Sequence, residues 1–163
     1  DMPVLIPFGV DQDPHFRITR DVAPNINKPK PALIHNIMIT ALSGPKGKMS
    51  ASNENETIYT TDSPEVVRKK INKYAFSGGQ PDIEEHRKKG GNPDIDVSFQ
   101  YLRIFFEPDD KKLQQIHDDY KSGKMLTGEL KEILIEKINK FLAIHQQKRE
   151  DARSQLDEFL FKD

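Results

Sequence analysis

The sequence predicts an α/β segment at the amino-terminal end of the chain, followed by an all-α segment. Two short and nearly continuous apolar runs, at residues 2–8 and 32–39, indicate buried strands of a parallel sheet covered on both faces. From residue 63 onward, apolar residues recur at helical spacing between short turns. Because two strands cannot make a stable parallel sheet alone, we expect this chain to be the carboxyl-terminal portion of a longer parent protein.

The composition limits the class of protein. Of the 163 residues, 35% are hydrophobic and 31% are charged, so the chain is polar but can bury a core. The formal net charge of −1 gives no argument for nucleic-acid binding, which would depend on local patches. There is no cysteine, which excludes disulfides and fits the reducing conditions of the cytoplasm. No apolar stretch reaches the roughly 18 residues of a membrane span, so no membrane contact is expected.

The first segment alternates strand, helix and strand. Residues 2–8 form the first expected strand, and residues 32–39 form the second. Between them, residues 11–23 are expected to form a helix. Either Asp11 or Asp13 could cap this helix, because aspartate side chains accept hydrogen bonds from the first free N–H groups.

The second segment is expected to contain six helices with short turns between them. The first begins after the capping residue Ser63 and ends at Gly78. Thr127 is expected to cap the longest helix, which carries a continuous apolar stripe. The other four helices cover residues 81–89, 97–106, 113–123 and 156–160. We divide the chain into residues 1–62, 63–150 and 151–163.

A short loop carries the main candidate site. The string Lys48-Met49-Ser50-Ala51-Ser52 follows the second strand and a glycine-rich lead-in. A lysine can neutralise the charge that builds on pyrophosphate as it leaves in a nucleotidyl transfer, and Ser50 and Ser52 can donate to phosphate oxygens. A solvated turn is the alternative for any lysine–serine loop, but the position of this string after a strand and glycines favours phosphate binding.

Gly9, Asp11 and Gln12 form a second candidate group, directly after the first strand. Ligands of open parallel sheets bind outside the carboxyl ends of the strands. There the Asp11 carboxylate can accept hydrogen bonds from ribose hydroxyls, and the Gln12 amide can both donate and accept. Gly9 would let a ligand approach the backbone closely. Asp11 could equally be a helix cap and Gln12 a solvated residue, and this segment alone does not decide between the two interpretations.

The histidines and the basic clusters give no further site. The five histidines lack metal-ligand spacing, so no metal site is predicted, and we expect His86 to lie on a solvated helical face. The lysines within residues 69–73 and the basic run 87–89 form two patches. Each patch is more typical of a solvated helix surface than of an RNA-binding surface.

Taken in order, these motifs resemble one family, the tryptophanyl-tRNA synthetases of class I. The string at residues 48–52 is similar to the second class I signature in its eukaryotic tryptophanyl form. The resemblance covers nearly the whole chain and separates it from the tyrosyl relatives. The other segments that resemble the family are Asp11–Pro24, Ala75–Gly79, Glu84–Arg87, Gly90–Asn92, Asp94–Leu102 and Met125–Lys131.

The resemblance implies an enzyme that converts tryptophan and ATP·Mg²⁺ to tryptophanyl-adenylate and pyrophosphate, and then transfers tryptophan to its tRNA. It implies that Lys48 stabilises the leaving pyrophosphate, with Ser50 and Ser52 assisting. Gln12 would hydrogen-bond the indole N–H, a contact that discriminates tryptophan from phenylalanine because an unpaired buried group is costly. The residues implied to bind ATP are Gly9, Asp11, Lys48, Met49, Ser50 and Ser52.

The resemblance also implies a domain organisation. Residues 1–62 would end a Rossmann-like catalytic domain, residues 63–150 would form a helical anticodon-binding domain, and residues 151–163 would return to the catalytic domain. The first class I signature, a His-x-Gly-His-like turn, is not found in the chain, so we expect an active cytoplasmic homodimer of the parent and an inactive isolated chain. Two alternatives remain: a synthetase-derived RNA-binding fragment without catalysis, and a class I enzyme that activates tyrosine.

Overall fold

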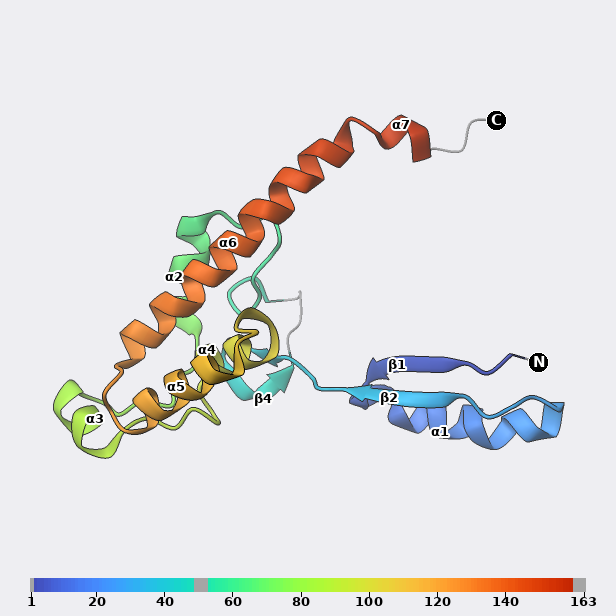
Figure 1. Ribbon diagram of the computed structural model, residues 1–163, viewed down its shortest axis with the longest axis horizontal. Helices are drawn as coiled ribbons and strands as arrows, with labels where there is room; N and C mark the ends of the chain where they lie inside the picture. Colours follow the sequence, from blue (N-terminus) through green and yellow to red (C-terminus); the bar gives the residue numbers. More distant parts are fainter. Residues whose placement is uncertain (1, 49–52, 160–163) are drawn as a thin grey trace. The chain divides into compact units, whose positions relative to one another are not determined.

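The computed structural model describes residues 2–48 and 53–159, with residues 45–48 and Phe159 described by their backbone alone. The chain divides into two compact units, Asp1–Ile39 and Thr40–Asp163 (Figure 1). We describe each unit by itself. The domain boundary expected between residues 62 and 63 stays a prediction.

The first unit consists of a strand, a helix and a second strand. β1 (Leu5–Gly9) pairs in parallel with β2 (Ala32–Asn36), and Phe8 lies opposite His35. This confirms the predicted parallel pairing. The connecting elements are the 3-10 turn η1 (Val10–Gln12), the helix α1 (Asp13–Val22) and the 3-10 turn η2 (Ala23–Ile26).

The expected cap of the first helix is wrong. The helix α1 begins at Asp13, and no side chain makes a capping hydrogen bond to its first turn. The Asp13 carboxylate instead accepts a hydrogen bond from Nε2 of His35 at 2.7 Å. Asp11 lies within the 3-10 turn that connects β1 to α1, one residue before Gln12, which occupies the N-cap position.

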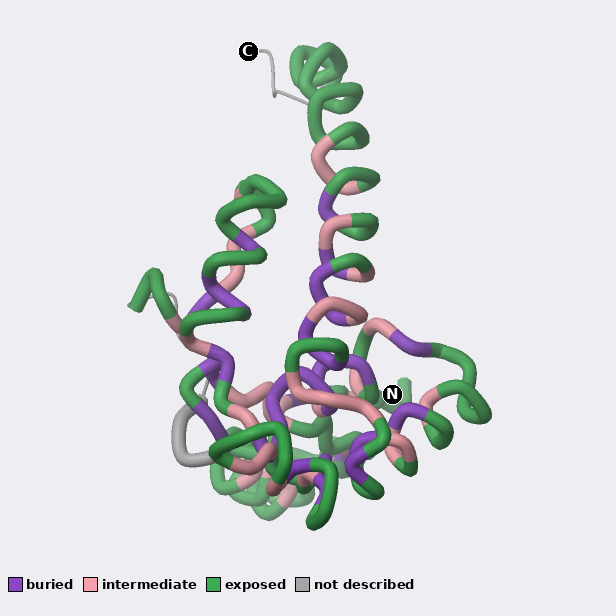
Figure 2. The backbone as a smooth tube through the Cα atoms, turned by 90° about the vertical axis from the view of Figure 1, so that its left-hand side faces the viewer, coloured by how far each residue is buried: buried purple, intermediate pink, exposed green. Residues whose placement is uncertain are grey.

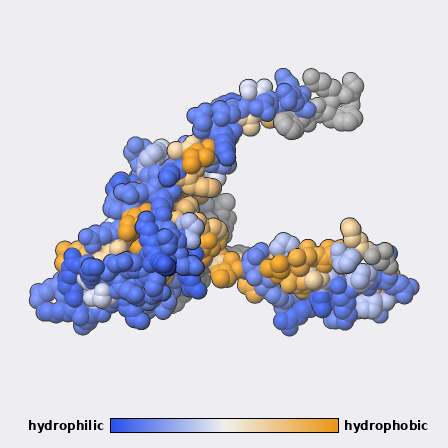
Figure 3. Space-filling view, viewed as in Figure 1, coloured by the Kyte–Doolittle hydropathy of each residue, from blue (hydrophilic) through white to orange (hydrophobic). Residues whose placement is uncertain are grey.

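The two strands are covered on a single face in this chain. Phe8 is buried and packs on Phe16 of α1, with ring centroids 4.5 Å apart. On the other face, Leu5 is 59% exposed and Ile34 is 46% exposed. Figure 3 shows apolar side chains gathered over the strands and hydrophilic ones over α1. The expectation of strands buried on both faces is therefore wrong here, because one helix covers one face of a two-stranded sheet.

The second unit begins with a β-hairpin that the sequence did not predict. β3 (Thr40–Ala41) pairs antiparallel with β4 (Gly44–Lys48), and Thr40 lies opposite Lys48. Gly44 has a φ of +121°, which the turn requires and which other residues rarely adopt. β4 was not predicted because it contains two glycines and a proline, which are uncommon in strands. Lys48 is therefore the last residue of β4, whereas the sequence analysis expected it in a loop.

The helical part confirms all six expected segments. Its core lies where α6 packs on α2 and α4, as the buried inner faces in Figure 2 show. The elements are α2 (Pro64–Tyr74), α3 (Ile83–Lys89), α4 (Val97–Tyr101), the π-helix η3 (Leu102–Phe106), α5 (Asp110–Lys121), α6 (Thr127–Arg153) and α7 (Leu156–Phe159). The buried residues of α6 run from Leu130 to Leu142, and the helix continues for eleven residues beyond Leu142 with none buried.

Of the predicted helix ends in this unit, the Ser63 cap is confirmed. Its Oγ accepts a hydrogen bond from the N–H of Val66 at 3.4 Å. The expected glycine stop at Gly78 is wrong, because α2 already ends at Tyr74. Gly78 is instead required by a close backbone approach, since a Cβ there would lie 2.0 Å from the carbonyl oxygen of Asn92.

The expected cap of the longest helix is also wrong. Thr127 is the first residue of α6, and its hydroxyl lies 3.1 Å from the Tyr120 hydroxyl and 3.2 Å from that of Ser77. The start of α6 is stabilised by Glu129, whose carboxylate accepts a hydrogen bond from the N–H of Leu126 at 2.6 Å. The threonine therefore connects α6 to the buried polar network described below.

Gly90, which ends α3, gives the first testable prediction. Its φ is +73°, and a Cβ there would lie 1.8 Å from the carbonyl oxygen of Lys121. Gly90→Ala is therefore expected to lower the free energy of unfolding by at least about 2 kcal/mol, measured by guanidinium chloride denaturation. Gly128→Ala is the control, because apart from its chain neighbours and the backbone of its own helix no atom lies within 4 Å of its Cβ position. It is expected to raise stability by up to about 1 kcal/mol, and equal effects of the two changes would contradict the prediction.

Candidate functional site

The first group of candidate residues lies at the carboxyl end of β1. Gly9 ends the strand and η1 follows at once, so Asp11 and Gln12 share one tight turn outside the strand end. Both residues are exposed. A Cβ on Gly9 would lie 2.8 Å from Oδ1 of Asp11, so this glycine keeps the turn compact. The structure thus brings Gly9, Asp11 and Gln12 together at the edge where open parallel sheets bind ligands.

A hydrogen bond after this turn connects it to the neighbouring strand. Oδ1 of Asp13 lies 2.7 Å from Nε2 of His35 on β2, and Oδ2 lies 2.5 Å from Nε of Arg17. The hydrogen bond from His35 is the main cause that holds the pKa of Asp13 below its ordinary value, and Arg17 adds to it. Sequence analysis missed this pair, because the two residues meet only once the parallel register of the strands is known.

The Asp13–His35 pair gives a prediction about pH. The pKa of Asp13 is lowered in the folded chain, so the contribution of the pair is present above the ordinary carboxyl pKa and is lost as pH falls through the folded value. His35→Ala is expected to raise the pKa of Asp13, and to raise it more than Arg17→Ala does. Carboxyl-carbon NMR titration of the chain and both variants measures this. A larger rise in Arg17→Ala would reverse the assigned order of causes.

The second group of candidate residues belongs to the second unit. The backbone of Lys48 is fixed at the end of β4 by its pairing with Thr40. The other signature residues, Met49, Ser50, Ala51 and Ser52, lie outside the described residues. The grouping of this signature with the turn at the end of β1 stays a prediction.

A buried carboxylate organises the helical unit. Asp96 is fully buried and accepts a hydrogen bond from the Tyr120 hydroxyl at 2.8 Å. Burial, and then the negative charge of Asp96, raises the pKa of Tyr120 to about 12, so the phenol keeps the proton that it donates. Asp96 also accepts from the N–H groups of Gly78 at 2.9 Å, Ser98 at 2.9 Å and Phe99 at 3.2 Å. One side chain therefore joins the loop at residue 78 to α4 and α5.

His86 is buried, and the expectation of a solvated helical face is wrong. Its side chain is the buried part of α3, and its ring lies against Tyr120 with centroids 5.3 Å apart. Nε2 lies 3.0 Å from the carbonyl oxygen of Met125, and Nδ1 accepts from the N–H of Gln80 at 3.4 Å. Within residues 2–48 and 53–159, no three His, Asp or Glu side chains are grouped so that they could hold a metal ion.

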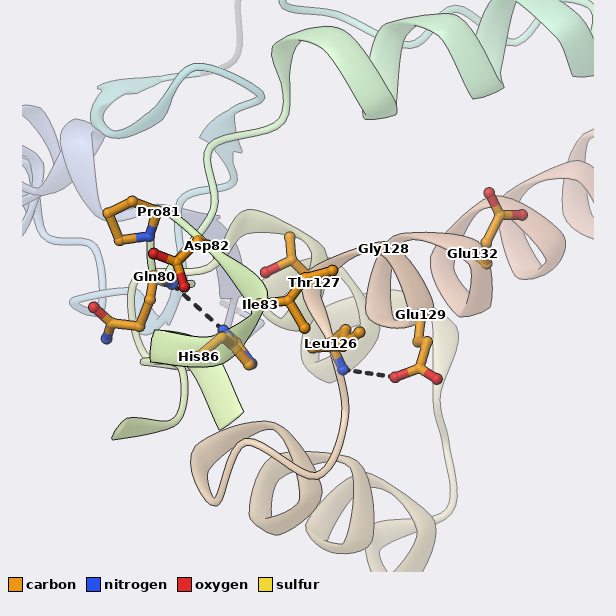
Figure 4. Close-up of a pocket in the computed structure, with 10 residues that line it drawn as sticks. All are labelled: Gln80, Pro81, Asp82, Ile83, His86, Leu126, Thr127, Gly128, Glu129 and Glu132. Atoms are coloured by element: carbon orange, nitrogen blue, oxygen red, sulfur yellow. Dashed lines mark hydrogen bonds between the residues drawn. The ribbon is translucent and has the colours of Figure 1, made fainter. Parts of the chain in front are cut away.

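A pocket of about 510 Å³ opens between the start of α3 and the start of α6 (Figure 4). Three acidic residues line the pocket, and each has a partner. The carboxylate of Asp82 accepts from the N–H of Glu85 at 2.7 Å and that of Glu129 accepts from the N–H of Leu126, both at helix starts, while Glu132 pairs with Arg68 at 2.6 Å. The lining holds no lysine or arginine and so suits a neutral group better than a phosphate. It is formed by Gln80, Pro81, Asp82, Ile83, His86, Leu126, Thr127, Gly128, Glu129 and Glu132.

The strand–turn–helix site and the helical unit fit one class of protein, and comparison with known proteins identifies it. The profile of the family "tRNA synthetases class I (W and Y)" matches residues 2–143, and the chain belongs to this family. Within it, the chain is similar to proteins named tryptophan–tRNA ligase. It is 58% identical to the one from Sulfurisphaera tokodaii over 96% of this chain and 41% of that protein. It is 54% identical to the human cytoplasmic one over 96% of this chain and 33% of that protein.

Solved structures agree with this assignment. A tryptophanyl-tRNA synthetase from Giardia lamblia superposes with a TM-score of 0.84 and 44% identity, over 90% of this chain and 36% of that one. Two enzymes from Aeropyrum pernix differ in their likeness to the chain. The tryptophanyl enzyme gives a TM-score of 0.87 and 37% identity, over 93% of this chain and 42% of that one. The tyrosyl enzyme gives a TM-score of 0.68 and 22% identity, over 88% of this chain and 42% of that one. This likeness shows the fold alone.

These comparisons confirm the resemblance to the tryptophanyl-tRNA synthetases. The chain spans about two fifths of the length of the archaeal relatives and a third of the human one, at 41% and 33%. In the part of the chain that the structure describes, every helix is too short or too polar to cross a bilayer.

Proposed function

We propose that the full-length parent of this chain is a tryptophan–tRNA ligase. It activates tryptophan with ATP·Mg²⁺ to tryptophanyl-adenylate and pyrophosphate, and then transfers tryptophan to its tRNA. The observation that carries this proposal is the 58% identity to a tryptophan–tRNA ligase over 96% of the chain. The lower identity to the tyrosyl enzyme, 22%, weighs against the tyrosine alternative.

The proposed roles of the site residues follow their positions. Asp11 and Gln12 leave the end of β1 as exposed polar groups on one turn, where the carboxylate suits the ATP ribose and the amide suits the indole N–H. Gly9 keeps room beside them for the nucleotide. Lys48 supplies the positive charge for pyrophosphate. Met49, Ser50 and Ser52 complete the ATP contacts, and Mg²⁺ enters with ATP as part of the substrate.

The proposed partners of the parent are tryptophan, ATP and tryptophan tRNA. Residues 63–150 serve as the anticodon-binding domain, and residues 151–163 return to the Rossmann-like catalytic domain. The pocket between α3 and α6 supports this role, because single-stranded RNA bases are held by apolar surfaces with polar edges. The parent is proposed to act in the cytoplasm as a homodimer.

The test is tryptophan-dependent ATP–pyrophosphate exchange, measured on the parent and on the 163-residue chain. We expect exchange by the parent with tryptophan, little with tyrosine, and none by the chain alone. Exchange with tyrosine in place of tryptophan would favour the tyrosyl alternative. Absence of exchange in the parent, together with ATP-independent tRNA binding by the chain, would favour the RNA-binding fragment.

A further inference from the structure

The hydrogen bond between Asp13 and His35 acts on the turn that carries Gln12. Asp13 belongs to both elements that meet there, because its N–H donates to the carbonyl oxygen of Val10 and closes η1, and because α1 begins at this residue. Gln12 lies directly before it, at the N-cap position of α1. The peptide bond between Gln12 and Asp13 is planar and rigid, so a displacement of Asp13 moves the backbone of Gln12 with it.

The turn is connected to β2 by a side chain and not held by helix caps. The residues before η1 and α1, Gly9 and Gln12, make no side-chain capping hydrogen bond. The side chain of Asp13 instead reaches β2, where its Oδ1 accepts from Nε2 of His35 at 2.7 Å. This carboxylate is 17% exposed, so its hydrogen bond is partly shielded from water. The position of the turn relative to β2 therefore depends on this contact.

The ring of His35 is itself held in place. The parallel register sets His35 opposite Phe8, and the two rings meet edge to face with their centroids 4.8 Å apart. Phe8 is buried and packs in turn on Phe16 of α1. An ionised carboxylate only accepts hydrogen bonds, so Nε2 of His35 carries the proton in its contact with Asp13. β2 thus presents a fixed donor to the residue that follows Gln12.

We infer that His35 is a positioning residue that acts through Asp13 on Gln12, and so on the binding of tryptophan. The inference rests on the proposed function, in which Gln12 hydrogen-bonds the indole N–H. Arg17 also contacts the Asp13 carboxylate, but it lies on α1 itself and cannot connect the turn to β2. Hydrogen bonds weaken steeply with distance and angle, so a small displacement of the Gln12 amide is enough to weaken its contact with tryptophan.

His35→Phe in the full-length parent tests the inference, because phenylalanine keeps a ring beside Phe8 and removes the donor to Asp13. It is expected to raise the KM for tryptophan in pyrophosphate exchange about tenfold and to leave kcat within about threefold of the wild type. A purely structural defect would reduce the amount of folded enzyme, and so would lower kcat without raising the KM. An unchanged KM for tryptophan would overturn the inference.

Two further variants separate this hydrogen bond from its surroundings. Arg17→Ala is the matched control, because it removes the other partner of the same carboxylate, with a side chain that is 76% exposed, and leaves the connection to β2. Its KM for tryptophan should stay within about twofold of the wild type. His35→Gln restores an N–H donor and should bring the KM back to within about threefold of the wild type. Equal KM increases in Arg17→Ala and His35→Phe, or no recovery in His35→Gln, would overturn the positioning role.

A double-mutant cycle with Gln12→Ala shows whether His35 acts through Gln12. The double variant should have a KM for tryptophan within about twofold of that of Gln12→Ala alone, and multiplicative effects would overturn the inference. If His35→Phe does not fold, Asp13→Ala removes the same hydrogen bond from the other side and should raise the KM to a similar extent. Absence of exchange in the wild-type parent, or a wild-type KM in Gln12→Ala, would contradict the proposed function, which is a separate failure.

Discussion

Lys48→Ala in the full-length parent is expected to slow tryptophan-dependent pyrophosphate exchange by about 10²–10³-fold. Negative charge develops on the leaving pyrophosphate in the transition state, and a fixed ammonium stabilises that charge more than it stabilises bound ATP. Ala51 stands where the broader class I signature has a second lysine, so no neighbouring ammonium of the signature can take over this role. The substitution should therefore lower kcat and leave the KM for tryptophan nearly unchanged.

Lys46→Ala is the matched control, because Lys46 carries the same charge on the same strand, β4. It is expected to leave exchange within about threefold of the wild type, since a general loss of positive charge near the site has a small effect. Steady-state exchange kinetics at saturating tryptophan compare the two variants. Lys48→Ala activity within a few-fold of the wild type would show that the lysine does not have the role assigned to it.

Asp96→Ala is expected to lower the free energy of unfolding of the chain by about 3–5 kcal/mol. The substitution leaves four buried donors without their acceptor, namely three N–H groups and the Tyr120 hydroxyl. Asp96→Asn should cost nearly as much, because both carboxylate oxygens accept hydrogen bonds and the amide places a donor against donors. Guanidinium chloride denaturation followed by circular dichroism measures both variants.

Asp94→Ala provides the comparison, because Asp94 lies two residues away and is exposed. Its removal is expected to change stability by no more than about 0.5 kcal/mol. Similar losses in the Asp94 and Asp96 variants would mean that the hydrogen bonds of the buried carboxylate are not the source of the effect.

The sequence predicted the elements whose signal is local. The apolar runs at residues 2–8 and 32–39 became two parallel strands, although each is shorter than its run. The helices after residue 63 were recognisable because apolar spacing and Ser63 act within one or two turns. The turn with Gly9, Asp11 and Gln12 could be placed because it follows a strand directly.

The features that sequence analysis missed depend on contacts between distant residues. Thr127 was expected to cap a helix because threonine is common at helix starts. Its hydroxyl instead lies within hydrogen-bond distance of the hydroxyls of Ser77 and Tyr120. His86 has charged neighbours in the sequence, yet it is turned towards Tyr120 in the core. The basic patch within residues 69–73 was expected to be a solvated helix surface, which is wrong for Lys70, because this side chain is buried and donates to the carbonyl oxygen of Thr57 and the carboxylate of Asp62. None of these partners can be identified before the helices are packed.

The long helix α6 has one further consequence. Its buried residues end at Leu142, and eleven more residues follow before the helix ends at Arg153. A separate helix of that length is only marginally stable in water, so packing supports the first part of α6 and the last turns depend mainly on their own propensity. Local opening of these turns therefore costs much less free energy than unfolding the bundle, and amide protons along this single helix should exchange at two separate levels of protection.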